Sequence, residues 1–151
     1  MLNVIEKVLI LQDVDVLSNM TSEQLSFVAA ITEEISMGPN QEIYREGDPP
    51  DGLYVVISGS VAMFRGEEEI DRIKPAGALG VWALFDDIPR LTTARTVVES
   101  QLLFVPREHF YNVLSDHVDI VERIFKQLAE RVRRLATKMD SNHEISDPGH
   151  R

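Results

Sequence analysis

The 151-residue chain contains no cysteine, which excludes disulfide bonds and thiolate chemistry. It also has no long uninterrupted apolar run, so we expect no segment to insert into a membrane. Residues 1–11 are apolar, but they include Glu6 and Lys7 and no small-residue cleavage site, which indicates a helix and not a signal peptide. These absences together fit a cytoplasmic protein.

Positive charge is scarce, because 15 Lys and Arg residues face 25 Asp and Glu residues, for a net charge of −10. General nucleic-acid binding needs a basic surface, so we expect no direct contact with nucleic acid. The four histidines do not form a metal-ligand spacing with carboxylates, and Ser58 and Ser60 lie in no nucleophile elbow. The sequence thus predicts a protein that is not an enzyme and that has neither a metal nor a cofactor.

The spacing of the apolar residues divides the chain into three parts. Residues 1–33 follow helical spacing, and Thr21 and Gln24 form a capping box before the second helix. Residues 107–139 also follow helical spacing, and residues 140–151 are polar, which predicts a flexible tail. The middle part has a period of two, with Gly and Pro turns between strand-like runs at residues 34–37, 42–44, 53–58, 60–65, 68–73, 92–98 and 102–105.

Several short strands at this spacing are typical of a sandwich or a barrel. We therefore predict a single α+β domain, mainly β, in which residues 34–106 form an antiparallel jelly-roll β-barrel. The N-terminal helices and a long C-terminal helix flank this barrel.

Residues 79–95 connect two of the predicted strands and contain an unusual combination of residues. Gly80 lets the backbone approach a neighbour or ligand closely, and a short apolar helical turn follows it. Arg90 lies where the chain re-enters the barrel. An arginine that faces backbone N–H groups suits an oxyanion, above all a phosphate. A plain barrel connection with a surface arginine explains the same residues, and these residues alone leave both interpretations open.

Two motifs resemble the cyclic-nucleotide-binding family, which includes the bacterial cyclic-AMP receptor protein and the regulatory subunits of protein kinase A. The first is Gly80-x-x-Ala83-Leu84, followed by Pro89-Arg90-x-x-Thr93-x-Arg95, which is similar to the family's phosphate-binding cassette. The second is Gly47-Asp48, followed by an apolar strand and Ser58-Gly59-x-Val61, which is similar to a barrel hairpin of the family. The resemblance implies that cAMP or cGMP is the candidate ligand. The implied ligand-binding residues are Gly80, Val81, Trp82, Ala83, Leu84, Pro89, Arg90, Leu91 and Thr92.

The sequence departs from the family at four positions. Val81 stands where the family has a glutamate that accepts the ribose 2′-hydroxyl, and a buried hydroxyl left unpaired costs about 1–3 kcal/mol. Leu91 and Trp82 are bulkier than the usual residues, and Ala76 replaces a glycine before the cassette. The pocket therefore binds a cyclic nucleotide weakly, binds a different anion, or binds nothing and serves as an interaction module.

The long C-terminal helix carries apolar residues that alternate steps of four and three, which is a heptad pattern. Asp119 is expected to cap this helix, and a homodimer is expected through residues 119–139. A helix that packs only on its own barrel is the alternative, and its basic residues are either solvated or dock on an acidic surface. The heptad residues are Val121, Phe125, Leu128, Val132, Leu135 and Met139.

The combined prediction is a regulatory or sensor module that binds a cyclic nucleotide or a related anion through Arg90 and signals through the C-terminal helix. One alternative is a dimerisation module without a ligand. Another is the effector domain of a transcription regulator that lacks its DNA-binding part. A complete regulator of this type needs a helix-turn-helix after the long helix, and none occurs before Arg151. A stand-alone regulator and one domain attached to another both fit the sequence.

Overall fold

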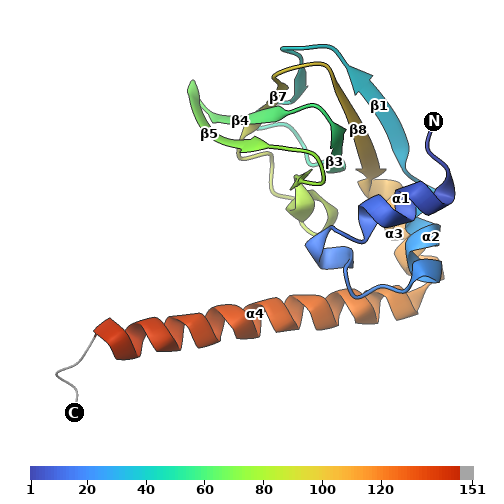
Figure 1. Cartoon of the computed structure of the whole chain (residues 1–151). Coiled ribbons are helices and arrows are strands. Elements are labelled where there is room, and N and C mark those ends of the chain that lie inside the picture. Colours follow the sequence, from blue (N-terminus) through green and yellow to red (C-terminus); the bar gives the residue numbers. More distant parts are fainter. Residues whose placement is uncertain (147–151) are drawn as a thin grey trace.

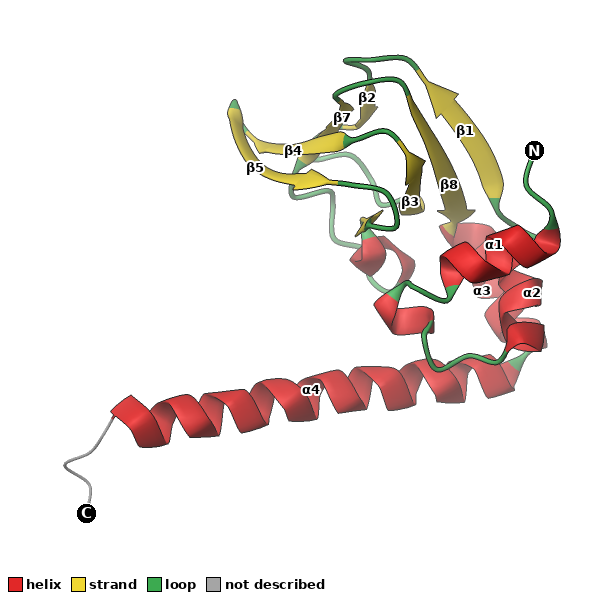
Figure 2. Ribbon diagram, viewed as in Figure 1, coloured by secondary structure: helices red, strands yellow, loops and turns green. Residues whose placement is uncertain are grey.

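The computed structural model describes residues 1–146, and side chains through residue 139. Two short helices open the chain, eight strands follow, and two helices end the described part (Figures 1 and 2). The helical elements are α1 (Val4–Leu11), η1 (Asp15–Leu17), α2 (Ser22–Ala29), η2 (Val81–Leu84), α3 (Arg107–Asp116) and α4 (Val118–Ser146). The strands are β1 (Glu33–Met37), β2 (Glu42–Tyr44), β3 (Gly52–Ser58), β4 (Val61–Arg65), β5 (Glu68–Ile73), β6 (Ala78–Leu79), β7 (Thr93–Thr96) and β8 (Ser100–Pro106).

The strands of the described part form two four-stranded sheets whose paired strands are all antiparallel. One sheet has the order β1-β8-β3-β6, and the other has the order β2-β7-β4-β5. Figure 2 shows the two sheets facing each other, with the helices gathered at one end and α4 projecting away from the barrel. This arrangement confirms the predicted α+β jelly roll with flanking helices.

Strand β3 connects the two parts of the hydrophobic core, because successive residues of a strand point to opposite faces. Leu53 and Val55 face the helices and pack in a cluster with residues of α1, α2, α3 and α4. Tyr54 and Val56 face the other sheet and pack inside the barrel. The helices are thus fastened to the outer face of the same strand whose inner face lines the barrel.

The predicted capping box of α2 is confirmed. The Gln24 N–H donates to Thr21 Oγ1 at 3.1 Å, and the Thr21 N–H donates to Gln24 Oε1 at 2.9 Å. The expectation that Asp119 caps the last helix is wrong, because α4 begins at Val118 and Asp119 lies in its first turn. Gln24 Nε2 donates to the Asp119 carboxylate at 2.6 Å, and this hydrogen bond lowers the pKa of Asp119.

Two further differences concern element boundaries. Helix α4 continues to Ser146, so the tail predicted from residue 140 is helical at its start, and residues 147–151 lie outside the described residues. Strand β6 was not expected, because two residues are too few to produce a period. It pairs with β3 through Leu79 opposite Tyr54, and this pairing places Gly80 at the edge of the barrel.

The first turns of α4 pack against the body of the protein. Ile120, Ile124 and Gln127 are buried, whereas Phe125 and Val132 are largely exposed. None of the helices within residues 1–146 is both long enough and apolar enough to cross a lipid bilayer.

Candidate ligand pocket around Arg90

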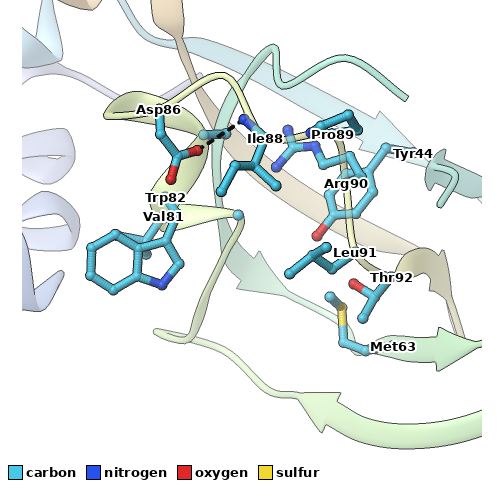
Figure 3. A pocket seen from close by; sticks show the side chains of 12 residues that line it. Tyr44, Met63, Val81, Trp82, Asp86, Ile88, Pro89, Arg90, Leu91 and Thr92 are labelled. Carbon is cyan, nitrogen blue, oxygen red and sulfur yellow. Dashed lines mark hydrogen bonds between the residues drawn. The ribbon is translucent and has the colours of Figure 1, made fainter. Parts of the chain in front are cut away.

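A pocket of about 240 Å³ opens between η2, the loop that follows it and the sheet that contains β2 and β4 (Figure 3). Every predicted ligand-binding residue except Leu84 lines this pocket. Leu84 is fully buried and packs in the core beneath η2 instead. The lining also includes four residues that were not predicted, namely Tyr44, Met63, Asp86 and Ile88.

Arg90 lies within the protein at the pocket wall, with only 7% of its surface exposed. Its Nη2 group donates to Asp51 Oδ1 at 2.5 Å and to the Gly52 carbonyl oxygen at 2.8 Å. Its guanidinium carbon lies 4.0 Å from the centroid of the Tyr44 ring. The interpretation of Arg90 as a surface arginine is therefore wrong, because a carboxylate, a carbonyl group and an aromatic ring enclose the charge.

The main chain of Arg90 is also fixed on both sides. The Gly47 N–H donates to the Arg90 carbonyl oxygen at 2.8 Å, and the Arg90 N–H donates to the Asp48 carbonyl oxygen at 2.8 Å. Gly47 has φ = 87°, a conformation that glycine adopts without steric cost. The Gly47-Asp48 motif thus holds the position of Arg90 as well as shaping the barrel.

Asp51 connects Arg90 to the interior of the barrel. Its second oxygen, Oδ2, accepts a hydrogen bond from the Tyr54 hydroxyl at 3.1 Å. Burial raises the pKa of both Tyr44 and Tyr54, so both hydroxyls stay protonated at neutral pH. The carboxylate itself is about half exposed, so water and Arg90 share it.

Gly80 and Arg90 fit together closely. Gly80 has φ = 77°, and a Cβ atom at this position would collide with Arg90 Nη1. The expected close approach of the backbone at Gly80 is therefore confirmed, with Arg90 as the neighbour. Arg90 Nε is buried and has no hydrogen-bond partner among the side chains and backbone of the described residues. An N–H group that is buried and unpaired costs free energy.

Trp82 forms the opposite wall of the pocket and reaches α4. Its side chain is 52% exposed, and the guanidinium carbon of Arg131 lies 5.2 Å from the centroid of the Trp82 rings. Arg131 also donates to Asp15 in η1 at 3.4 Å, and Gln127 Nε2 donates to the same carboxylate at 3.1 Å. One wall of the pocket is thus in contact with the helix that projects from the barrel.

The loop at the mouth of the pocket is fastened by α3. Arg107, the first residue of α3, donates to the Asp86 carbonyl oxygen at 2.6 Å and to the Asp87 carboxylate at 2.5 Å. The Asp86 carboxylate accepts from the Ile88 N–H at 3.2 Å (Figure 3). Both acids at this tip therefore serve the conformation of the loop.

Sequence reasoning missed the three residues that hold the guanidinium of Arg90, namely Tyr44, Asp51 and Gly52. Asp51 and Gly52 lie in a stretch rich in Gly, Pro and Asp, which is also what an ordinary turn contains. Tyr44 ends a three-residue strand that carries no motif. Their only shared signal is that a buried arginine requires an acid and acceptors, and the sequence does not show that Arg90 is buried.

Two antiparallel sheets, flanking helices and a pocket built around one buried arginine define a jelly-roll domain. The family model described as "Cyclic nucleotide-binding domain" matches residues 34–117. The chain belongs to the cyclic nucleotide-binding domain family.

Two relatives of this chain are regulatory proteins by name. A CRP-like cAMP-activated global transcriptional regulator of Mycobacterium tuberculosis is 31% identical over 130 residues, which cover 81% of this chain and 55% of that protein. A cAMP-dependent protein kinase regulatory subunit of Hypocrea atroviridis is 27% identical, covering 75% of this chain and 24% of that protein. The chain thus spans about half the length of the first relative and a quarter of the second.

The crystal structure of the N-terminal domain of a transcriptional regulator from Streptomyces coelicolor has the same fold. It superposes with a TM-score of 0.78 at 25% identity and covers 83% of this chain and 94% of that domain.

Proposed function

We propose that the protein is a non-enzymatic regulatory module in which a small anion binds beside Arg90 and signals through α4. Cyclic nucleotides such as cAMP and cGMP are candidate ligands of low affinity. The observation that carries this proposal is a guanidinium group at the pocket wall that donates hydrogen bonds to the described residues through only one nitrogen, Nη2. The names of two relatives, which include cAMP, support the same ligand class.

Low affinity for a cyclic nucleotide follows from Val81. The aliphatic side chain of Val81 lines the pocket and cannot accept a hydrogen bond from a ribose hydroxyl. A hydroxyl that loses water without gaining a partner weakens binding by about 1–3 kcal/mol. Arg90 therefore supplies the main polar attraction for the ligand.

The route from the pocket to α4 passes through Trp82. A ligand in the pocket touches Trp82, whose rings lie against Arg131 of α4. Arg131 and Gln127 both bind Asp15, so movement of Trp82 alters the contact between α4 and η1. A ligand that binds better to one arrangement of these groups shifts the population toward that arrangement.

We also propose that α4 forms a homodimer through residues 119–139. Phe125, Val132, Leu135 and Met139 expose between 56% and 69% of their surfaces, although all four are large and apolar. Val121 and Leu128 are half-buried at the edge of the body. The helix therefore packs on the protein with one side and leaves an apolar heptad stripe free on another, which suits a second copy of the same helix.

Pairing between Arg90 and Asp51 favours one alternative, in which Arg90 is only a structural cation and the module binds no ligand. The name of the mycobacterial relative supports a place for the domain as the effector part of a transcription regulator. A ligand titration separates the first alternative from the proposal.

The titration can use Trp82, which is the only tryptophan of the chain and lines the pocket. Purified protein is titrated with cAMP and then cGMP while tryptophan emission and thermal unfolding are recorded. A ligand at about 100 times its dissociation constant adds roughly 2.7 kcal/mol, which raises the midpoint by about 5–10 °C. Arg90→Lys is expected to abolish the rise, whereas Arg95→Lys, outside the pocket, retains it.

A response in wild type that Arg90→Lys preserves would contradict the role of Arg90. No response to either nucleotide, or to inorganic phosphate at high concentration, would favour the module without a ligand. For the dimer, Val132→Glu with Met139→Glu is expected to give monomers in sedimentation experiments, and Thr137→Glu, on the opposite side of α4, leaves the mass unchanged. Monomeric wild type would contradict the dimer.

A further inference from the structure

We propose that the pocket prefers a small anion with a flat apolar body, of the aromatic phosphate or carboxylate class, over a sugar phosphate. The proposal rests on the proposed function, in which Arg90 binds the anionic group. It concerns the other end of the pocket, which selects the rest of the ligand.

The hydrogen-bonding groups of the pocket are unevenly placed. Arg90, Tyr44 and Thr92 lie together at one side, as Figure 3 shows. Trp82 lies at the other side, and Ile88 and Leu91 lie between them. An anionic group at Arg90 therefore directs the rest of a ligand toward apolar side chains.

These apolar side chains are exposed without a ligand. Trp82, Ile88 and Leu91 each expose more than half of their surfaces at the mouth of the pocket. Val81 lies beside Trp82 and extends this apolar wall, and Met63 adds apolar surface beside Thr92 (Figure 3). A flat apolar body would cover this surface and stack on the Trp82 rings, whereas sugar hydroxyls would lose water there without finding acceptors.

The carboxylate nearest to this wall is already engaged. Asp86 accepts from the Ile88 N–H, and its main-chain carbonyl accepts from Arg107. The hydrogen bond from Ile88 uses one oxygen of this carboxylate, Oδ1, and fixes its orientation, so only Oδ2 is left to accept from a ligand hydroxyl. This wall of the pocket thus offers a sugar a single carboxylate oxygen in place of an acid at position 81.

The charge at the other end also limits the ligand. Asp51 already offsets the charge of Arg90, and within the described residues the guanidinium donates hydrogen bonds only through Nη2, which leaves Nη1 for the ligand. An oxygen of a singly charged anion can accept from this nitrogen. The volume of about 240 Å³ lies below the about 300–1,000 Å³ that is common for drug-sized ligands. A single-ring or two-ring anion matches these features.

Isothermal titration calorimetry with 1-naphthyl phosphate, ribose 5-phosphate and inorganic phosphate tests the preference, because the three probes share a phosphate and differ in body. We expect 1-naphthyl phosphate to bind at least about tenfold more tightly than ribose 5-phosphate. Val81→Gln, which adds a neutral hydrogen-bonding group to the wall, should reduce this ratio at least about threefold. Val98→Gln, at an exposed site away from the pocket, should leave it unchanged.

Two different failures can be told apart. Equal or tighter binding of ribose 5-phosphate, still weakened by Arg90→Lys, would overturn the preference and leave the proposed function standing. Binding of none of the three probes, or binding that Arg90→Lys does not weaken, would overturn the proposed function and the preference with it.

Discussion

Two arginines of this protein have the same kinds of partner in very different surroundings. Arg90 and Arg131 each lie over an aromatic ring and each pair with an aspartate. The Arg90 side chain is 4% exposed, with its aspartate at 2.5 Å, whereas the Arg131 side chain is 40% exposed, with its aspartate at 3.4 Å. The contacts are of the same kinds, but the exposed fractions of the two side chains differ tenfold.

The difference indicates which contact holds the fold and which can move. Removing one partner of a buried pair leaves other groups without hydrogen bonds, so such pairs are costly to break. An exposed pair is replaced by water and contributes about 0–1 kcal/mol. Arg90 thus belongs to the rigid frame, and Arg131 belongs to a contact that opens at little cost in free energy.

The strongest way to test this comparison is Arg90→Ala. The change removes the donor for the Gly52 carbonyl oxygen and leaves a void beside Tyr44, so we expect the free energy of unfolding to fall by about 2–4 kcal/mol. Urea denaturation measures the change. Arg95→Ala, another arginine beside an aromatic ring, serves as the control and should cost less. A loss below about 0.5 kcal/mol for Arg90→Ala would mean that Arg90, like the exposed Arg131, contributes little to the stability of the fold.

Gly80→Ala tests the close contact between Gly80 and the Arg90 guanidinium. The positive φ of Gly80 costs an alanine about 1–2 kcal/mol, and the added Cβ collides with Arg90 Nη1. We expect a destabilisation of at least this amount in urea denaturation. The double variant Gly80→Ala with Arg90→Ala should lose less than the sum of the single variants, because the collision disappears. Strict additivity would argue against the contact.

Alkaline pH should lower the free energy of unfolding through Tyr44 and Tyr54, whose rings lie near the Arg90 guanidinium. Burial raises the pKa of Tyr44 and Tyr54 above the ordinary value of 10.0. Both tyrosines therefore bind protons more tightly in the folded state, and their stabilising effect is present below pH 10 and is lost above it. Each contributes a decline of up to about 1.4 kcal/mol per pH unit there. Urea denaturation between pH 9 and 11 measures the slope, and Tyr54→Phe should make it shallower.

The smallest expected effect belongs to Arg131→Ala. The exposed pair and the contact with Trp82 should change the free energy of unfolding by less than about 1 kcal/mol. The tryptophan emission should nevertheless shift, because Trp82 loses the guanidinium that lies over its rings. Lys126→Ala, which removes a surface ion pair on the same helix, should leave the emission unchanged. A large loss of stability for Arg131→Ala would remove the distinction between the two arginines.

Much of the fold follows from local patterns in the sequence. The period-two runs identified each strand longer than two residues in the described part, because apolar residues alternate along the runs and turn residues separate them. The Thr21 capping box identified the start of α2, because its hydrogen bonds link residues three apart. Capping was less reliable at Asp119, where Gln24, distant in sequence, binds the carboxylate.

The site was predicted in part. The cassette motif identified Gly80 and Arg90 because their spacing is fixed within one loop. Asp51 and Arg131 are 39 and 49 positions away from Arg90 and Trp82, so their pairing depends on the folded arrangement of the sheets and of α4. The orientation of Arg90 toward the interior also depends on these distant groups.

Helix α4 is fastened near its start and extends far from the barrel (Figure 1). Under the proposed function, α4 would act as a lever whose pivot lies at the contact of Arg131 with Asp15 and Trp82. From Arg131 to Ser146 the helix extends about 22 Å, so a tilt of about 5° at the pivot displaces its far end by about 2 Å. A small tilt of α4 near the pocket would thus become a larger displacement at the far end of the helix, where a second subunit or an attached domain would contact it.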